Sequence, residues 1–173
     1  MKKICLVLSL LLLLSSCGAK PHSRTLFLMD TVIQLTVYGD DAEDVLAESE
    51  QILAEYARAC SPTEGETPVL NQAQGGALSP ILGDVLAQSL ALSEETNGAF
   101  DPALGRLIAL WQAQTVPDTA ALSAAKRASG HDKVALSADR SSCTLRDGAT
   151  LHFGAIAKGA ANDALYRALT ARG

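Results

Sequence analysis

Residues 151–159 read Leu-His-Phe-Gly-Ala-Ile-Ala-Lys-Gly, and this stretch decides how the rest of the chain is interpreted. An apolar extended segment at 150–153 leads into a turn in which Gly154 and Gly159 flank Lys158, and an amphipathic run follows. Glycine lets a backbone approach a phosphate closely, a helix start contributes partial positive charge, and a lysine adds a full one. The stretch therefore suits a phosphorylated cofactor. An ordinary β–α turn ended by glycine explains the same residues.

The composition of the 173-residue chain is that of one packed globular domain. Hydrophobic residues make up 48% and charged residues 19%, a balance that argues against disorder. The formal net charge is −5 and only 4% of the residues are aromatic. Because nucleic-acid binding needs a basic face and often aromatic stacking, we expect no nucleic-acid partner.

The N-terminal residues 1–16 are typical of a signal peptide rather than of a folded domain. Two lysines precede an apolar run too short to span a bilayer, and small residues come directly before Cys17. This arrangement resembles a bacterial lipoprotein signal, which implies cleavage before Cys17 and a lipid on that cysteine. The mature protein would then be anchored at the extracytoplasmic face of the cell membrane. A plain secretory signal with a chance cysteine is the alternative.

Two cysteines, Cys60 and Cys143, remain in the mature domain. In an oxidising compartment they could form a disulfide, but the sequence does not show whether their α-carbons come within bonding distance. The chain has no Cys-x-x-Cys pair and its three histidines are scattered, so we expect no soft-metal site.

Hydrophobic periodicity predicts an α+β fold for residues 26–173, with a mostly antiparallel sheet packed by helices. A polar tether at 17–25 precedes this domain. The expected strands are 26–38, 133–137, 142–146 and 150–153, the expected helices are 42–60, 80–97, 103–111 and 118–130, and 61–76 is expected to be a loop. Ser79 and Asp118 are the expected N-caps of two of these helices.

Three motifs follow one another in a fixed order. The first is Met-Asp-Thr at 29–31 before a strand, the second is Asn-Gly-Ala-Phe-Asp-Pro at 97–102 with Trp111 beyond it, and the third is 153–159 with Asp163. Together they resemble the ApbE family of flavin transferases. The resemblance implies transfer of the FMN half of FAD, with Mg²⁺, to a threonine or serine hydroxyl of a target protein, with release of AMP.

The resemblance also assigns site residues. It implies that Ala99, Phe100 and Asp101 form a wall of the FAD site, that Met29 packs against this wall, and that Lys158 lies near the phosphates. Each has a plainer explanation, since an aspartate before proline is often a helix cap and a methionine is often part of the core.

The same resemblance places one magnesium ligand on this chain. The backbone carbonyl of Ala155 matches a position that offers a main-chain oxygen to Mg²⁺, a hard cation that prefers oxygen ligands.

The chain departs from the family pattern at several positions. His152 stands where aspartate is usual, Asp30 where glycine is usual and Ala160 where an aromatic residue is usual, and the loop at 61–70 keeps only its concluding Leu70-Asn71. The resemblance covers only the first half of family members, so we expect a truncated copy with the catalytic residues in the missing half. A lipid-anchored flavin-binding or interaction protein without activity, and a non-functional fragment, are the alternatives.

Residues 147–150, Asp-Gly-Ala-Thr, resemble the short sequences that such enzymes modify. A tight turn before a strand explains the same four residues, and we favour the turn.

Overall fold

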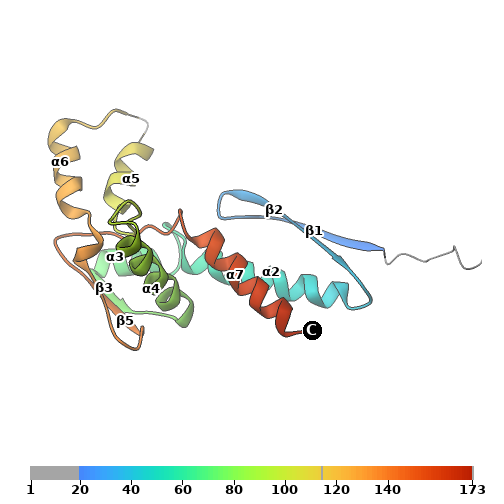
Figure 1. Ribbon diagram of the computed structural model, residues 1–173. Coiled ribbons are helices and arrows are strands. Elements are labelled where there is room, and N and C mark those ends of the chain that lie inside the picture. The colour runs from blue at the N-terminus through green and yellow to red at the C-terminus, as the bar shows by residue number, and fades with distance from the viewer. Residues whose placement is uncertain (1–19, 114, 173) are drawn as a thin grey trace, which may run out of the picture.

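The computed structural model describes residues 20–113 and 115–172 (Figure 1). Its elements, in chain order, are β1 (Pro21–Leu28), β2 (Thr31–Tyr38), α2 (Ala42–Ala59), α3 (Glu66–Ala73), β3 (Gly75–Ala77), α4 (Pro80–Glu95), α5 (Gly105–Gln112), α6 (Thr119–Ala128), the 3-10 helix η1 (His131–Lys133), β4 (Val134–Leu136), β5 (Ser142–Leu145) and α7 (Ala157–Ala171). The predicted signal peptide 1–16, Cys17 and the first part of the tether lie outside the described residues.

Two antiparallel sheets and the helices around them confirm the predicted α+β class. β1 pairs with β2 in a hairpin, and β5 lies between β3 and β4 in a second, three-stranded sheet. Figure 1 shows the hairpin beside α2 and α7, while α5 and α6 project together from the other end of the molecule. The predicted helices at 42–60, 80–97, 103–111 and 118–130 correspond to α2, α4, α5 and α6.

The tether predicted at 17–25 is wrong from Pro21 onward, because β1 begins there. Pro21 faces Tyr38 at one end of the hairpin, and the strand alternates between half-buried and exposed residues. Its half-buried polar residues reach acidic residues of α2. Arg24 donates to Glu50 at 2.8 Å and to Glu43 at 3.1 Å. The sequence did not predict this part of the strand, because its inward side chains are polar and face a charged helix, so the apolar alternation of a strand is absent.

The turn of this hairpin holds two residues in the left-handed region. Met29 has φ +52° and Asp30 has φ +55°, and Leu28 pairs with Thr31 on either side of them. A two-residue hairpin turn of this kind favours glycine or asparagine, because a Cβ atom is strained at positive φ. This geometry explains why glycine suits position 30 and shows that Asp30 carries a conformational cost.

We expect Asp30→Gly to raise the free energy of unfolding by about 0.5–1 kcal/mol, since it removes a strained left-handed side chain. Asp30→Val should lower it, because a β-branched residue tolerates positive φ least. Urea denaturation of the two variants and the parent chain checks the prediction. A glycine variant less stable than the parent would contradict this turn geometry.

The core lies around α4 and the small sheet. Leu82, Val85 and Leu86 of α4 are fully buried, and they share one apolar cluster with Leu151 and Phe153. Ser79 caps α4 as predicted, since its hydroxyl accepts from the N–H of Leu82 at 3.3 Å.

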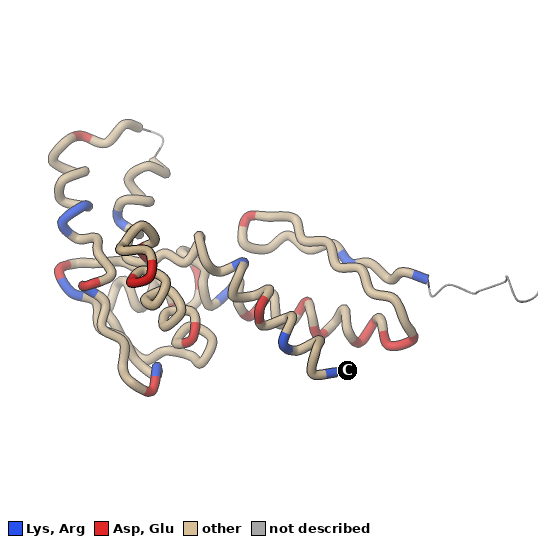
Figure 2. The backbone as a smooth tube through the Cα atoms, in the orientation of Figure 1, with Lys and Arg blue, Asp and Glu red and all other residues tan. Residues whose placement is uncertain are grey.

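Helix α7 packs along α2, with its C-terminal end at the N-terminal end of α2 (Figure 1). Its first turns carry the buried alanines 157, 160 and 161, and Ala157 and Ala160 belong to the same apolar cluster as Phe153. At the far end, Arg172 pairs with Glu48 and lies 3.5 Å from Asp41. Figure 2 shows the basic C-terminal end of α7 beside acidic positions of α2. The hairpin and α7 are therefore held on the same helix.

Two further predictions need correction. The predicted loop 61–76 contains α3 and the first two residues of β3. α3 was hidden because it is short and has proline in its first turn, yet it buries Thr67, whose hydroxyl donates to the Ala59 carbonyl at 2.8 Å. The predicted strand 150–153 is not part of a sheet, because its backbone groups bond to loops and to a side chain instead.

Candidate functional site

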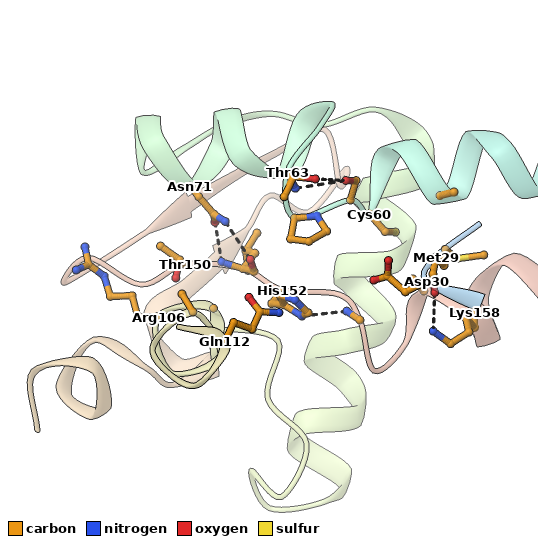
Figure 3. Close-up of a pocket in the computed structure, with 18 residues that line it drawn as sticks. Met29, Asp30, Cys60, Thr63, Asn71, Arg106, Gln112, Thr150, His152 and Lys158 are labelled. Carbon is orange, nitrogen blue, oxygen red and sulfur yellow. Dashed lines mark hydrogen bonds between the residues drawn. The ribbon is translucent and has the colours of Figure 1, made fainter. Parts of the chain in front are cut away.

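The segment 150–154 and the start of α7 form one wall of a cavity of about 670 Å³ (Figure 3). The other walls come from the β1–β2 turn, the end of α2 and the residues after it, α3, and one side of α5. The residues that line the cavity and bear on its chemistry are Met29, Asp30, Cys60, Asn71, Arg106, Gln112, Thr150, His152, Gly154 and Lys158. Segments far apart in the sequence therefore meet at residues 150–158.

The turn at 154–157 is set by a single carbonyl. Phe153 O accepts from the N–H of Ile156 at 3.0 Å and from the N–H of Ala157 at 2.8 Å, and α7 begins at Ala157. Within the described residues, no backbone carbonyl accepts from the N–H of Lys158 or Gly159. These N–H groups of the first helical turn therefore lack a backbone partner, and the anion site predicted from the glycines stays a prediction.

Lys158 joins the two sides of the cavity. Its Nζ donates to the backbone carbonyl of Met29 at 3.1 Å, which ties the start of α7 to the hairpin turn (Figure 3). Both residues line the cavity, so the structure brings together the two site residues predicted from the first and third motifs.

The second motif lies behind the cavity wall. Ala99, Phe100 and Asp101 are not among the residues that line the cavity. Both oxygens of the Asp101 carboxylate accept from backbone N–H groups, Oδ1 from Ala103 at 2.7 Å and Oδ2 from His131 at 3.1 Å. The carboxylate of Asp101 thus joins two backbone segments, but it is not the helix cap of the plainer explanation, because the N-cap of α5 is Leu104 and that of η1 is Gly130. The FAD wall predicted for residues 99–101 is not part of this cavity.

Ala155 also stays outside the lining of the cavity, although its neighbour Gly154 belongs to it. Its backbone carbonyl accepts no backbone hydrogen bond from the described residues. The oxygen is therefore available to a ligand, and its role at a metal stays a prediction.

The ApbE family model matches residues 29–173. This chain belongs to the ApbE family. It is 28% identical over 181 residues to the FAD:protein FMN transferase of Treponema pallidum, a match that covers 90% of this chain and 49% of that protein. The chain therefore spans about half the length of its relative.

Solved ApbE structures share the fold. The ApbE protein of Thermotoga maritima has a TM-score of 0.79 and 20% identity, over 86% of this chain and 52% of that one. The flavin transferase ApbE of Vibrio cholerae also has a TM-score of 0.79 and 20% identity, over 88% and 54%. The apo form of Pseudomonas stutzeri flavinyl transferase ApbE has a TM-score of 0.80 and 23% identity, over 92% and 54%.

In this ApbE chain, Asn71 is the positioning residue that sequence reasoning missed. Its Oδ1 accepts from the N–H of Leu151 at 2.6 Å, and its Nδ2 donates to the carbonyl of Leu151 at 2.9 Å. The side chain replaces a neighbouring strand and holds the cavity wall in place. The retained Leu70-Asn71 pair was the signal, but nothing in the sequence showed what the amide contacts.

Thr150 presents an orphaned polar atom at the wall of the ApbE cavity. Its Oγ1 is buried and has no hydrogen-bond partner in the described chain. The preceding residues form the tight turn that was favoured, with Asp147 at φ +54°, Gly148 at φ +74° and the N–H of Ala149 bonded to Arg146 O at 2.9 Å. Because the Thr150 hydroxyl is buried directly after this turn, a modifying enzyme cannot reach it.

The cysteine thiols are chemically quiet. Cys60 and Cys143 are both buried and free, so the possible disulfide is absent from the described chain. Burial, with a smaller effect of the Glu66 charge, raises the pKa of Cys60 to about 12. The thiol is therefore protonated at neutral pH, and it does not supply a thiolate nucleophile to the cavity.

Proposed function

We propose that this chain forms the FAD-binding half of a FAD:protein FMN transferase. The observation that carries the proposal is the cavity in which Lys158 and the glycine-flanked turn meet the hairpin turn. Lys158 and the N–H groups of the first turn of α7 would bind the FAD pyrophosphate. The activity named for the Treponema pallidum relative supports the same assignment.

The proposed reaction transfers the FMN group of FAD to a hydroxyl group. A serine or threonine hydroxyl oxygen of a flavin-accepting protein bonds to the phosphorus of the FMN half, the P–O bond to the AMP half breaks, AMP leaves and the hydroxyl proton is released. Such a transfer depends on positioning and on neutralising the phosphate charge. The residues of this chain would bind and orient FAD, and the groups that activate the hydroxyl are expected in the half of the family fold that the chain does not span.

The proposed reaction uses Mg²⁺, and we propose one ligand for this ion on this chain. The carbonyl of Ala155 accepts no backbone bond and is available to a metal. Among the described residues, no group of three or more His, Cys, Asp or Glu side chains could hold a metal ion. These residues do not complete a magnesium site, so we derive no step through the metal.

We further propose that the mature protein is attached through a lipid on Cys17 at the extracytoplasmic face of the cell membrane. The arrangement of residues 1–17 supports this location. In the described ranges, no helix is long and apolar enough to cross a membrane.

A binding protein without transferase activity is the second candidate. It is favoured by one observation: among the described residues, no group of three or more His, Cys, Asp or Glu side chains could hold a metal ion. Flavin fluorescence retained on a threonine-containing acceptor protein after denaturing electrophoresis would distinguish the transferase from the binder.

Titration of the chain with FAD, followed by flavin fluorescence, tests the binding site. We expect Lys158→Ala to weaken FAD binding about tenfold, because a charge-assisted contact to a phosphate is lost. The control is Lys126→Ala on the exposed side of α6, which should bind FAD like the parent chain. Equal affinities for all three proteins, or no binding at all, would overturn the proposed site.

A further inference from the structure

The ring of His152 is fixed in the cavity wall by one backbone donor. The N–H of Gly154 donates to His152 Nδ1 at 3.2 Å (Figure 3). A Cβ atom at position 154 would lie 2.7 Å from His152 Cε1, so glycine is needed for the ring to occupy this place. Because a backbone N–H can only donate, Nδ1 must be unprotonated and the ring proton is on Nε2.

This ring is uncharged at neutral pH. Burial lowers the pKa of His152 below its usual value. The ionisable groups that line the same cavity are Asp30 of the hairpin turn, Cys60 at the end of α2, Arg106 of α5 and Lys158 of α7. Arg106 is already engaged, since its Nε donates to the carbonyl of Gly148 at 2.6 Å. His152 therefore contributes an uncharged hydrogen-bond donor to the cavity, and the positive charges of the cavity come from Arg106 and Lys158.

The one hydrogen bond recorded for the His152 ring among the described residues is the bond from Gly154 to Nδ1, so Nε2–H is left without a protein acceptor there. The backbone N–H of His152 is satisfied by the carbonyl of Pro102 at 2.8 Å, so the main chain beneath the ring is held as well. A donor with a set tautomer, on a fixed backbone and without a protein partner, is prepared for an acceptor atom of a ligand.

We propose that His152 binds FAD directly, with Nε2–H donating a hydrogen bond to an acceptor oxygen of the nucleotide. The oxygen belongs either to the pyrophosphate or to a carbonyl of the flavin ring. This inference rests on the proposed function. It gives His152 a role different from that of Lys158, because a neutral donor orients the ligand and its contact depends little on salt.

Two substitutions distinguish the role of Nδ1 from the role of Nε2. His152→Asn keeps an acceptor near the position of Nδ1 for the Gly154 N–H but removes the donor from the cavity. His152→Gln places an amide donor near the position of Nε2. We expect the asparagine variant to bind FAD about tenfold more weakly and the glutamine variant to stay within about threefold of the parent chain. Both should melt within a few degrees of the parent.

Ligand fragments locate the acceptor oxygen. Titrations with FAD, riboflavin and ADP are compared for the parent chain and His152→Asn. Weaker binding of FAD and ADP alone assigns the contact to a phosphate, and weaker binding of FAD and riboflavin alone assigns it to the flavin ring. Either result supports the inference.

Other results overturn the inference. These are unchanged FAD binding by His152→Asn, equal losses in the asparagine and glutamine variants, or an equal loss for both fragments, which would indicate a general change of the cavity. A parent chain that does not bind FAD removes the proposed function together with this inference. A parent that binds FAD, with a tolerant position 152, removes the inference alone.

Discussion

Replacing Phe153 by alanine is expected to lower the free energy of unfolding by about 3–5 kcal/mol. Phe153 is 1% exposed and belongs to the apolar cluster around α4. Its backbone carbonyl also accepts from Ile156 and Ala157, so a shift of this residue reaches the turn that begins α7. Because whole domains are stable by only about 5–15 kcal/mol, the variant should be largely unfolded at modest urea concentrations.

A matched control is available on the hairpin. Phe27 is 72% exposed, on the outer face of β1. Phe27→Ala should change the free energy of unfolding by less than about 0.5 kcal/mol, because an exposed ring loses little apolar burial. Urea denaturation followed by circular dichroism measures both variants. Similar losses for Phe27→Ala and Phe153→Ala would contradict the burial of Phe153 described above.

The long helices were predictable because their signals are local. The hydroxyl of Ser79 and the carboxylate of Asp118 each accept from a backbone N–H in the first turn of the helix that they precede. Capping of this kind depends on neighbours three residues apart, so the sequence contains the complete interaction. The fold class followed from these helices and the alternating strands between them.

The errors concern segments whose partners are distant. Residues 21–25 form a strand because Arg24 reaches α2, and residues 150–153 leave the sheet because a side chain of α3 satisfies Leu151. Neither contact produces a periodic pattern in the neighbouring sequence. The local sequence indicates buried segments and turns, but it does not indicate which distant group forms a hydrogen bond with a given residue.

At the candidate site, too, the local features were predictable and the contacts between distant residues were not. The glycines and the lysine at 154–159 indicated an anion site, and the structure places Met29 and Lys158 on one cavity. Asp101, by contrast, uses its carboxylate to bind the backbone of Ala103 and His131. A motif shows that a residue matters to the family, and the geometry distinguishes a residue that lines the cavity from one that supports it.

We expect Asn71→Ala to lower the free energy of unfolding by about 2–4 kcal/mol, and to weaken FAD binding as well. The amide of Asn71 makes two hydrogen bonds to the backbone of Leu151, across 80 residues of sequence. Leu151 is 1% exposed, so water does not replace the lost partner and both backbone groups remain unsatisfied. The wall of the cavity should then loosen at the segment that carries His152.

The matched control is another amide. Gln51 of α2 donates to Glu55 on an exposed helix surface at 3.0 Å, and Gln51→Ala should cost less than about 0.5 kcal/mol. Asn71→Asp tests the geometry further. It keeps the acceptor for the Leu151 N–H but turns a carboxylate oxygen toward the Leu151 carbonyl, so it too should be destabilised. Equal unfolding free energies for Asn71→Ala and Gln51→Ala would show that Asn71 does not hold this segment.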